Sequence, residues 1–188
     1  MLALHPISNS LPDELFVDSV PEKTSAFAEN IPGNKSTYIY HEEDAYLDHY
    51  RRAYYGVTRR KTGWDSGRHL EIMASGCVPF FIDMGLLPQQ TLSFYPRGRI
   101  AAAMSLPGVR PVLYERDKRE PLVMNAVPHN SRDRMWYLSP SSFSVAPSAF
   151  NASVRAAYFD LSAAILAHAR RHLSASAVAT HVLRTMGE

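Results

Sequence analysis

The sequence predicts an α/β fold with a Rossmann-like parallel sheet flanked by helices. Residues 77–82 are continuously apolar, which is typical of a strand buried on both faces of a parallel sheet. Residues 53–58 have the aromatic and β-branched composition of a second strand. Between them, a capping residue, an apolar face and a terminal glycine indicate a helix. Strand, helix and strand in this order form the repeating unit of a parallel sheet.

Length and composition predict one domain spanning residues 1–188. The chain has 188 residues, of which 46% are hydrophobic and 20% charged, close to the average for globular proteins. Four prolines interrupt the first 35 residues, so residues 1–35 are expected to be an irregular, extended arm that wraps the core.

The elements before the apolar strand follow from local patterns. Residues 36–40, with the sequence STYIY, predict a strand, and the apolar spacing of residues 42–52 predicts a helix. Residues 53–58 form the next strand, and the basic residues 59–63 form a turn. The following helix starts at Asp65 or Ser66 as its N-cap and stops at Gly76.

Beyond the apolar strand, the sequence predicts a loop at residues 88–98 and a short helix at residues 99–104. Two further strands are expected at residues 110–114 and 122–127, followed by a surface loop at residues 139–148. Asn151 is expected to cap a long amphipathic helix, and Ser174 to start a second one. Two helices therefore close the predicted domain.

The start of the helix at residues 66–76 is a candidate anion site. Such sites lie at the carboxyl end of a parallel sheet, where a helix start offers unpaired N–H groups and a partial positive charge. Gly67 allows a phosphate to approach the backbone, and Arg68 adds a guanidinium fork. The alternative is that Asp65 and Ser66 only cap the helix, while Arg68 pairs with a surface carboxylate.

Neighbouring residues allow two interpretations each. Glu71 is placed to accept hydrogen bonds from ribose hydroxyls or to form an intrahelical ion pair with Arg68. Lys61 belongs to a basic turn that either adds positive potential to the site or is simply solvated. Trp64 either stacks on a base or sugar or anchors the turn, and His69 faces the site or the solvent.

Several function classes are disfavoured. The 20 basic and 18 acidic residues give a net charge of +2, too balanced to indicate a nucleic-acid or membrane-surface binder. No P-loop, GxGxxG, GxSxG or zinc-spaced Cys/His set occurs, so neither a metal site nor a cofactor is expected. The N-terminus does not read as a signal peptide, no run approaches a membrane span, and Cys77 is the single cysteine. We therefore expect a cytoplasmic protein.

The run from Tyr54 to Asp83, YYGVTRRKTGWDSGRHLEIMASGCVPFFID, resembles the donor-binding region of GT-B glycosyltransferases, especially exostosin-like ones. It is also similar to uncharacterised glycosyltransferase-like proteins with a GWDxxRHxEI motif. The resemblance implies that the chain is a single GT-B-type half holding a nucleotide-diphosphate sugar without a metal. Carried over by residue, it implies that Ser66, Gly67 and Arg68 contact the diphosphate and that Glu71 contacts the ribose.

The resemblance does not supply a catalytic base, because GT-B enzymes commonly carry it on a separate acceptor domain. Asp83, directly after the apolar strand, is the candidate in this chain. The leading expectation is sugar transfer to an unidentified acceptor, for which a glycan is the candidate. The alternative is a non-catalytic module that binds a nucleotide or glycan, or associates with a separate acceptor domain. A purely structural interaction protein is the third possibility.

Overall fold

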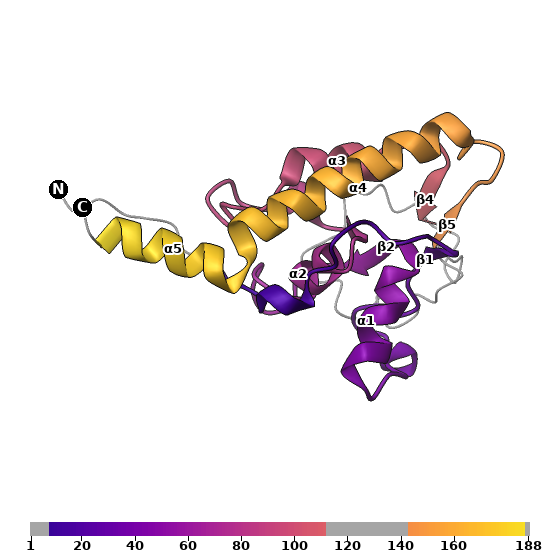
Figure 1. Cartoon of the computed structure of the whole chain (residues 1–188). Helices are drawn as coiled ribbons and strands as arrows, with labels where there is room; N and C mark the ends of the chain where they lie inside the picture. Colours follow the sequence, from indigo (N-terminus) through magenta and orange to yellow (C-terminus); the bar gives the residue numbers. More distant parts are fainter. Residues whose placement is uncertain (1–7, 112–142, 187–188) are drawn as a thin grey trace.

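The computed structural model describes residues 8–111 and 143–186, and it has a Rossmann-like α/β architecture (Figure 1). Three parallel strands lie in the order β1 (Ser25–Phe27), β2 (Ala53–Thr58) and β3 (Val78–Phe81). All four residues of β3 are buried, as its continuous apolar run predicts. The predicted fold class is confirmed.

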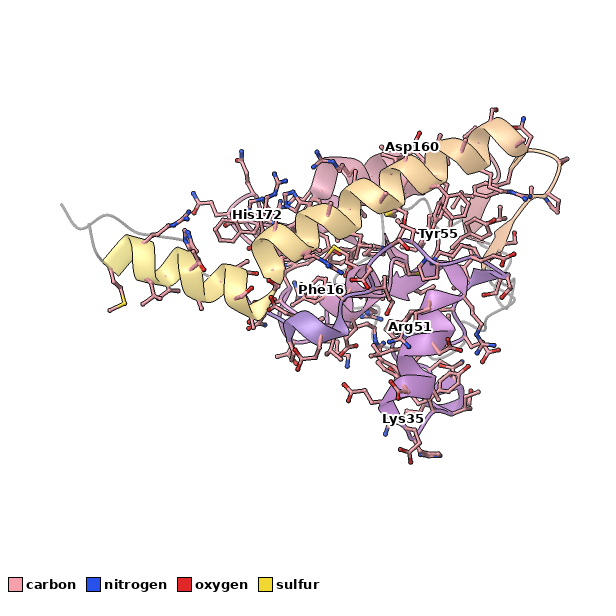
Figure 2. All side chains as sticks on the ribbon, in the orientation of Figure 1. Phe16, Lys35, Arg51, Tyr55, Asp160 and His172 are labelled. Carbon is pink, nitrogen blue, oxygen red and sulfur yellow. The ribbon has the colours of Figure 1, made fainter. Side chains whose placement is uncertain are left out.

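Helices cover both faces of this sheet. Helix α1 (Glu43–Arg51) connects β1 to β2, and α2 (Gly67–Ala74) connects β2 to β3. Helices α1 and α2 contact each other, with α1 on β2 and α2 on both β2 and β3, whereas α3 (Arg97–Met104) packs on β3. Helix α4 (Ala152–Leu173) contacts both α2 and α3 (Figure 1). The Tyr55 hydroxyl donates to the Ala103 carbonyl of α3 at 2.8 Å, and its ring packs against Tyr158 of α4. Tyr55 thus lies inside, whereas Asp160 is exposed on the outer side of α4 (Figure 2).

The end of α2 has the geometry that its sequence predicts. Gly76 adopts a φ of +65° directly after the C-cap residue Ser75. The Gly76 N–H donates to the Met73 carbonyl at 3.0 Å, and the Cys77 N–H donates to the Ile72 carbonyl at 3.1 Å. These two bonds form a Schellman motif, which ends the helix and directs the chain into β3.

One expectation for the N-terminal part is wrong. Residues 36–40 do not form a strand, because Lys35–Thr37 is the 3-10 helix η2 and Thr37 is hydrogen-bonded within its own turn, to the Ile31 N–H and the Asn34 carbonyl. The outer strand β1 instead lies within the segment expected to be an extended arm. This arm also contains the 3-10 helix η1 (Asp13–Leu15).

The C-terminal part largely follows the prediction. The Asn151 side chain accepts from the Val154 N–H at 3.1 Å and caps α4, and α5 (Ala175–Met186) begins after Ser174. Helix α3 starts two residues earlier than expected, after the 3-10 helix η3 (Met84–Leu86).

The second sheet contains β4 (Val109–Pro111) and β5 (Phe143–Val145), which are antiparallel. Strand β4 overlaps the strand expected at residues 110–114, and β5 lies inside the segment expected to be a loop at residues 139–148. The strand expected at residues 122–127 lies outside the described residues.

The beginning and end of the described chain are tied together. The Leu11 N–H donates to the Leu173 carbonyl at 3.1 Å, and the Ala175 N–H donates to the Leu11 carbonyl at 2.8 Å. The Arg170 guanidinium donates to the Val17 carbonyl at 2.6 Å. The arm is therefore held against the junction of α4 and α5. Among the described residues, no helix is long and apolar enough to cross a membrane.

Candidate functional site

The start of α2 lies where β2 ends, on the carboxyl edge of the sheet. Ser66 is the N-cap residue, but its side chain makes no capping hydrogen bond to the helix. Gly67 is exposed, and a Cβ atom added to it would meet only the Glu71 Oε1 atom, at 3.6 Å. The first turn of α2 is therefore not covered by its own capping side chain. The His69 N–H donates to the Ser66 carbonyl at 3.0 Å, whereas the helix supplies no acceptor for the Gly67 and Arg68 N–H groups.

Arg68 lies beside this helix start, with its guanidinium largely enclosed. Its Cζ atom lies 5.3 Å from the centre of the Tyr38 ring, a cation–π arrangement. The Nε and Nη1 atoms are buried and have no hydrogen-bond partner among the described residues. The ion pairs of the described residues do not include Arg68, so pairing with a surface carboxylate is not what the structure shows.

Arg68 keeps its charge among the tyrosines that surround it. Burial alone would lower the pKa of Arg68, but the nearby Tyr50, Tyr46 and Tyr38 raise that pKa above its ordinary value. For Tyr38, burial acts to raise the pKa, but the Gly33 N–H and the Arg68 guanidinium outweigh it and lower the pKa. Arg68 therefore stays charged, although its Nε and Nη1 atoms lack an acceptor.

Glu71 is held by Tyr46 and not by Arg68, the partner in the predicted intrahelical ion pair. Its Oε2 atom accepts a hydrogen bond from the Tyr46 hydroxyl at 2.6 Å, and the Tyr46 and Tyr50 hydroxyl oxygens lie 3.4 Å apart. No ion pair with Arg68 is formed. Because the Oε1 atom lies near Gly67, the carboxylate is turned back toward the start of α2.

His69 faces neither the solvent nor the exposed helix start. It is buried, with Nδ1 2.7 Å from the Thr58 hydroxyl and Nε2 2.9 Å from the Trp64 carbonyl. Burial lowers the pKa of His69 to about 4, against the opposing effect of the Trp64 carbonyl. The neutral imidazole thus connects the end of β2 to the loop that precedes α2.

The basic turn after β2 is held by Asp83 and Trp64. The Arg60 N–H donates to both carboxylate oxygens of Asp83, at 3.1 and 3.2 Å. The Arg60 guanidinium lies 5.4 Å from the Trp64 ring, which packs on Phe81 with the ring centres 6.2 Å apart. Trp64 therefore anchors the turn to the core, while Lys61 is exposed.

Sequence reasoning missed the aromatic surroundings of this site. Tyr46 and Tyr50 are four residues apart, which places them on one face of α1, and this spacing could have suggested a pair. Tyr38 gave no such signal, because its position over Arg68 depends on how the segment after β1 folds back. We refer to Tyr38, Tyr46, Tyr50, Arg68 and Glu71 together as the tyrosine–arginine cluster.

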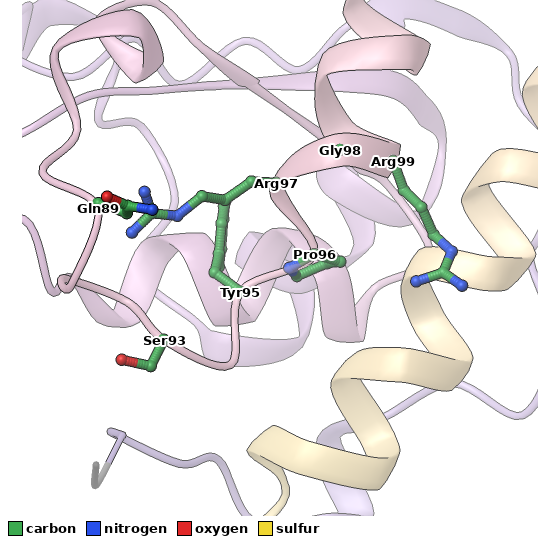
Figure 3. Close-up of a pocket in the computed structure, with 7 residues that line it drawn as sticks. All are labelled: Gln89, Ser93, Tyr95, Pro96, Arg97, Gly98 and Arg99. Carbon is green, nitrogen blue, oxygen red and sulfur yellow. The ribbon is translucent and has the colours of Figure 1, made fainter.

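A cavity of about 660 Å³ lies at a second helix start, that of α3 (Figure 3). Its polar lining consists of Gln89, Ser93, Arg97 and Arg99, with Gly98 between the two arginines, and Tyr95 and Pro96 complete the wall. None of these residues belongs to the predicted set, although the sequence PRGR at residues 96–99 repeats the glycine–arginine pair of the α2 start.

Within residues 8–111 and 143–186, no three His, Cys, Asp or Glu side chains are grouped as a metal site would require. No protein-family model matches this chain, and neither a curated protein nor a solved structure is significantly similar to it.

Proposed function

We propose that this chain binds a nucleotide-sugar donor at the start of α2 and acts in sugar transfer as a GT-B-type glycosyltransferase protein. One observation carries the proposal: a helix start without a side-chain cap lies beside a charged arginine with two buried nitrogen atoms, Nε and Nη1, that have no acceptor. A buried donor left unpaired destabilises a fold unless a ligand supplies the acceptor. A diphosphate supplies several negatively charged acceptors at once.

Each residue has a distinct part in the proposed complex. The N–H groups at Ser66, Gly67 and Arg68 bind phosphate oxygens, and the Arg68 guanidinium binds the same diphosphate once the Tyr38 ring moves aside. Tyr38 is 38% exposed, so its ring lies at the surface of the cluster and not in the core. Glu71 accepts from the ribose hydroxyls through Oε1, while Tyr46 holds Oε2. Lys61 and Trp64 border the site from the preceding loop.

The proposed chemistry needs no metal. Negative charge develops on the nucleoside diphosphate as the sugar–phosphate bond breaks, and the α2 start together with Arg68 would stabilise it. Transfer also requires a base near the acceptor hydroxyl. Asp83 is the candidate in this chain.

A non-catalytic donor-binding module is the second candidate, and the position of Asp83 favours it. Both carboxylate oxygens of Asp83 already accept from the Arg60 N–H, so this side chain holds the turn together. In this version, a separate acceptor domain supplies the base. We further propose a cytoplasmic location for either form, with which the buried, unbridged Cys77 agrees.

Donor binding is tested with Gly67→Ala. The added methyl group reaches only ordinary van der Waals contact within the protein, so the fold is kept and α2 is stabilised if anything. The same methyl group lies over the first-turn N–H groups and weakens the binding of UDP-glucose or GDP-mannose about tenfold or more by calorimetry. Gly63→Ala is the matched control, because its methyl group points into open space. Equal affinities of the two variants would refute the site.

Catalysis is tested separately, by measuring donor hydrolysis and transfer to a panel of acceptors. Asp83→Asn keeps an acceptor for the Arg60 N–H but cannot act as a base. Loss of turnover in this variant would support the proposal that the chain is an enzyme with Asp83 as its base. Tight donor binding without turnover in the wild-type protein supports the module.

A further inference from the structure

The Tyr38 hydroxyl lies where several positively polarised groups of the protein meet. Its oxygen accepts a hydrogen bond from the Gly33 N–H at 3.1 Å, and the Arg68 Cζ atom lies 5.3 Å from the centre of the Tyr38 ring. Burial alone would raise the pKa of Tyr38, but the Gly33 N–H and the Arg68 guanidinium lower it, and the charge of Lys61 acts in the same direction. A neutral phenol therefore occupies a position that suits an anionic oxygen.

The turn that presents the Gly33 N–H is held by its own hydrogen bonds. The Asn34 N–H donates to the Ile31 carbonyl at 3.1 Å, and the Thr37 hydroxyl accepts from the Ile31 N–H at 2.9 Å. Gly33 has a φ of +92°, a conformation that favours glycine. None of these features involves the Tyr38 side chain, so the donor at Gly33 keeps its position when that side chain moves.

Tyr38 can leave its position without disrupting a helix or strand. It directly follows η2, and residues 38–41 belong to neither a helix nor a strand. Tyr38 and its neighbour Ile39 are both exposed, and Figure 2 shows Lys35, the first residue of η2, at the edge of the molecule. Rotation of the ring about its Cα–Cβ bond breaks the contacts with Gly33 and Arg68 but no backbone hydrogen bond of η2 or α1.

We propose that the Tyr38 hydroxyl is a placeholder for a phosphate oxygen of the bound diphosphate, and that the Gly33 N–H joins Arg68 and Lys61 in binding this phosphate once Tyr38 has rotated away. The proposal rests on the proposed donor function and adds to it a binding group, Gly33, and a competitor within the chain. Hydrogen bonds to a charged phosphate oxygen are stronger than those to a neutral phenol, so the ligand displaces Tyr38.

Competition between Tyr38 and the diphosphate sets the affinity of the site. The ligand reaches Gly33 and Arg68 only in those molecules in which Tyr38 has rotated away. Its apparent affinity is therefore reduced by the fraction of molecules in that state. In the empty protein, the Tyr38 ring instead stabilises the charge of Arg68 through the cation–π contact. Removing the ring should thus strengthen diphosphate binding, whereas a ring that only stacked on the ligand would have the opposite effect.

The test is calorimetric titration of the full chain with inorganic pyrophosphate and with UDP-glucose. Tyr38→Leu should bind pyrophosphate about tenfold more tightly than the wild-type protein, because the competitor is removed. Tyr38→Phe keeps the ring over Arg68 but frees the Gly33 N–H, so the gain should be smaller, about threefold. Ile39→Ala is the matched control, because it changes the neighbouring exposed side chain and should bind pyrophosphate as the wild-type protein does.

The outcomes separate the placeholder from the donor function. Equal or weaker pyrophosphate binding in Tyr38→Leu would overturn the placeholder, and so would an equal gain in Ile39→Ala. UDP-glucose binding that is weakened in Gly67→Ala but unchanged in Tyr38→Leu would keep the donor function and overturn the placeholder. Tighter pyrophosphate binding in Tyr38→Leu, with no UDP-glucose binding by any of the proteins, would keep the placeholder and refute the nucleotide-sugar donor. No binding of either compound by any of the proteins would overturn both.

Discussion

At the scale of single residues, His69 shows how one buried side chain connects the sheet to the candidate site. The Trp64 carbonyl can only accept, so the hydrogen-bond pattern requires the proton on Nε2. Nδ1 is then free to accept from the Thr58 hydroxyl. A second proton would create a buried charge, and this burial lowers the pKa of His69 to about 4, with the nearby Arg68 charge acting in the same direction.

Stability is therefore expected to fall as the pH falls from 7 to 4. The unfolded chain binds a proton at His69 near its ordinary pKa of 6.5, whereas the folded chain does so only near pH 4. The stabilisation is complete above pH 6.5 and decreases as the pH drops, by roughly 3 kcal/mol in total. His49, whose pKa is likewise lowered to about 4 by burial, has an effect of the same sign.

Urea unfolding at pH 7 and pH 4.5 measures this dependence. Near pH 5, the slope of the free energy of unfolding against pH should be smaller in His69→Gln than in the wild-type protein, by about 1.4 kcal/mol per pH unit. His49→Gln serves as the comparison. An unchanged slope in His69→Gln would mean that this imidazole is solvated in the folded protein.

The sequence indicated Arg68 and Glu71 as candidates, and their partners in the structure depend on tertiary packing. Helical spacing placed both residues near the start of α2, and it left open whether they pair with each other. The structure gives each a tyrosine partner instead, from the segment after β1 and from α1. No local pattern encodes such a contact, because it joins segments more than 20 residues apart.

At the scale of elements, α2 packs unusually close to the sheet. A Cβ atom added to Gly56 in β2 would lie 2.9 Å from the Cγ1 atom and 3.1 Å from the Cγ2 atom of Ile72. Gly56 thus leaves room for a branched side chain of α2 directly over the strand. The position of α2, and with it the helix start that forms the candidate site, depends on this contact.

Gly56→Ala is expected to destabilise the protein by about 1–3 kcal/mol, because the added methyl group overlaps Ile72. Ile72→Ala alone should also destabilise it, by about 2–5 kcal/mol through the cavity it leaves. The double variant should be destabilised by less than the sum of the two single effects, because the methyl group added at Gly56 then fills part of the cavity left by Ile72→Ala. Chemical unfolding of the four proteins measures the coupling, and strict additivity would contradict the contact.

Elements with strong local signals were predicted well, and the others were not. Strand β2, helix α2 and strand β3 have capping residues, apolar runs and a glycine stop, and their predicted bounds agree with the structure within one residue or two. Residues 36–40 have strand composition but form a turn, because β propensity acts only where a neighbouring strand is available. Strand β1 has three residues, too few for a period of two to stand out.

At the scale of the whole molecule, packing is uneven. The sheet and its helices share a core that includes Tyr55, Phe80 and Tyr158, all 0–1% exposed. Helix α5 has no buried residue, and Leu183 and Met186 on it are 72% and 80% exposed. Figure 1 shows α5 extending away from the sheet. A helix of this length is marginally stable in water without tertiary contacts.

Amide hydrogen exchange is expected to reflect this difference. The amides of α5 should exchange at least roughly 100-fold faster than those of β2, because local opening there breaks few contacts. Mass spectrometry of the full chain at several exchange times resolves the two segments. Equal protection in α5 and β2 would show that α5 is held by contacts additional to those described.

The pairing of Leu11 with the backbone at residues 173 and 175 also determines the order in which the chain can assemble during synthesis. Residue 11 leaves the ribosome before its partners, which emerge only after more than 160 further residues have been added. Until then, Phe16, whose ring is buried in the folded protein, lacks the Arg170 side chain that donates a hydrogen bond to its carbonyl. This segment is therefore made before α4 but docks only after α4 has emerged, and a nascent chain stalled before α4 would present it to chaperones and proteases.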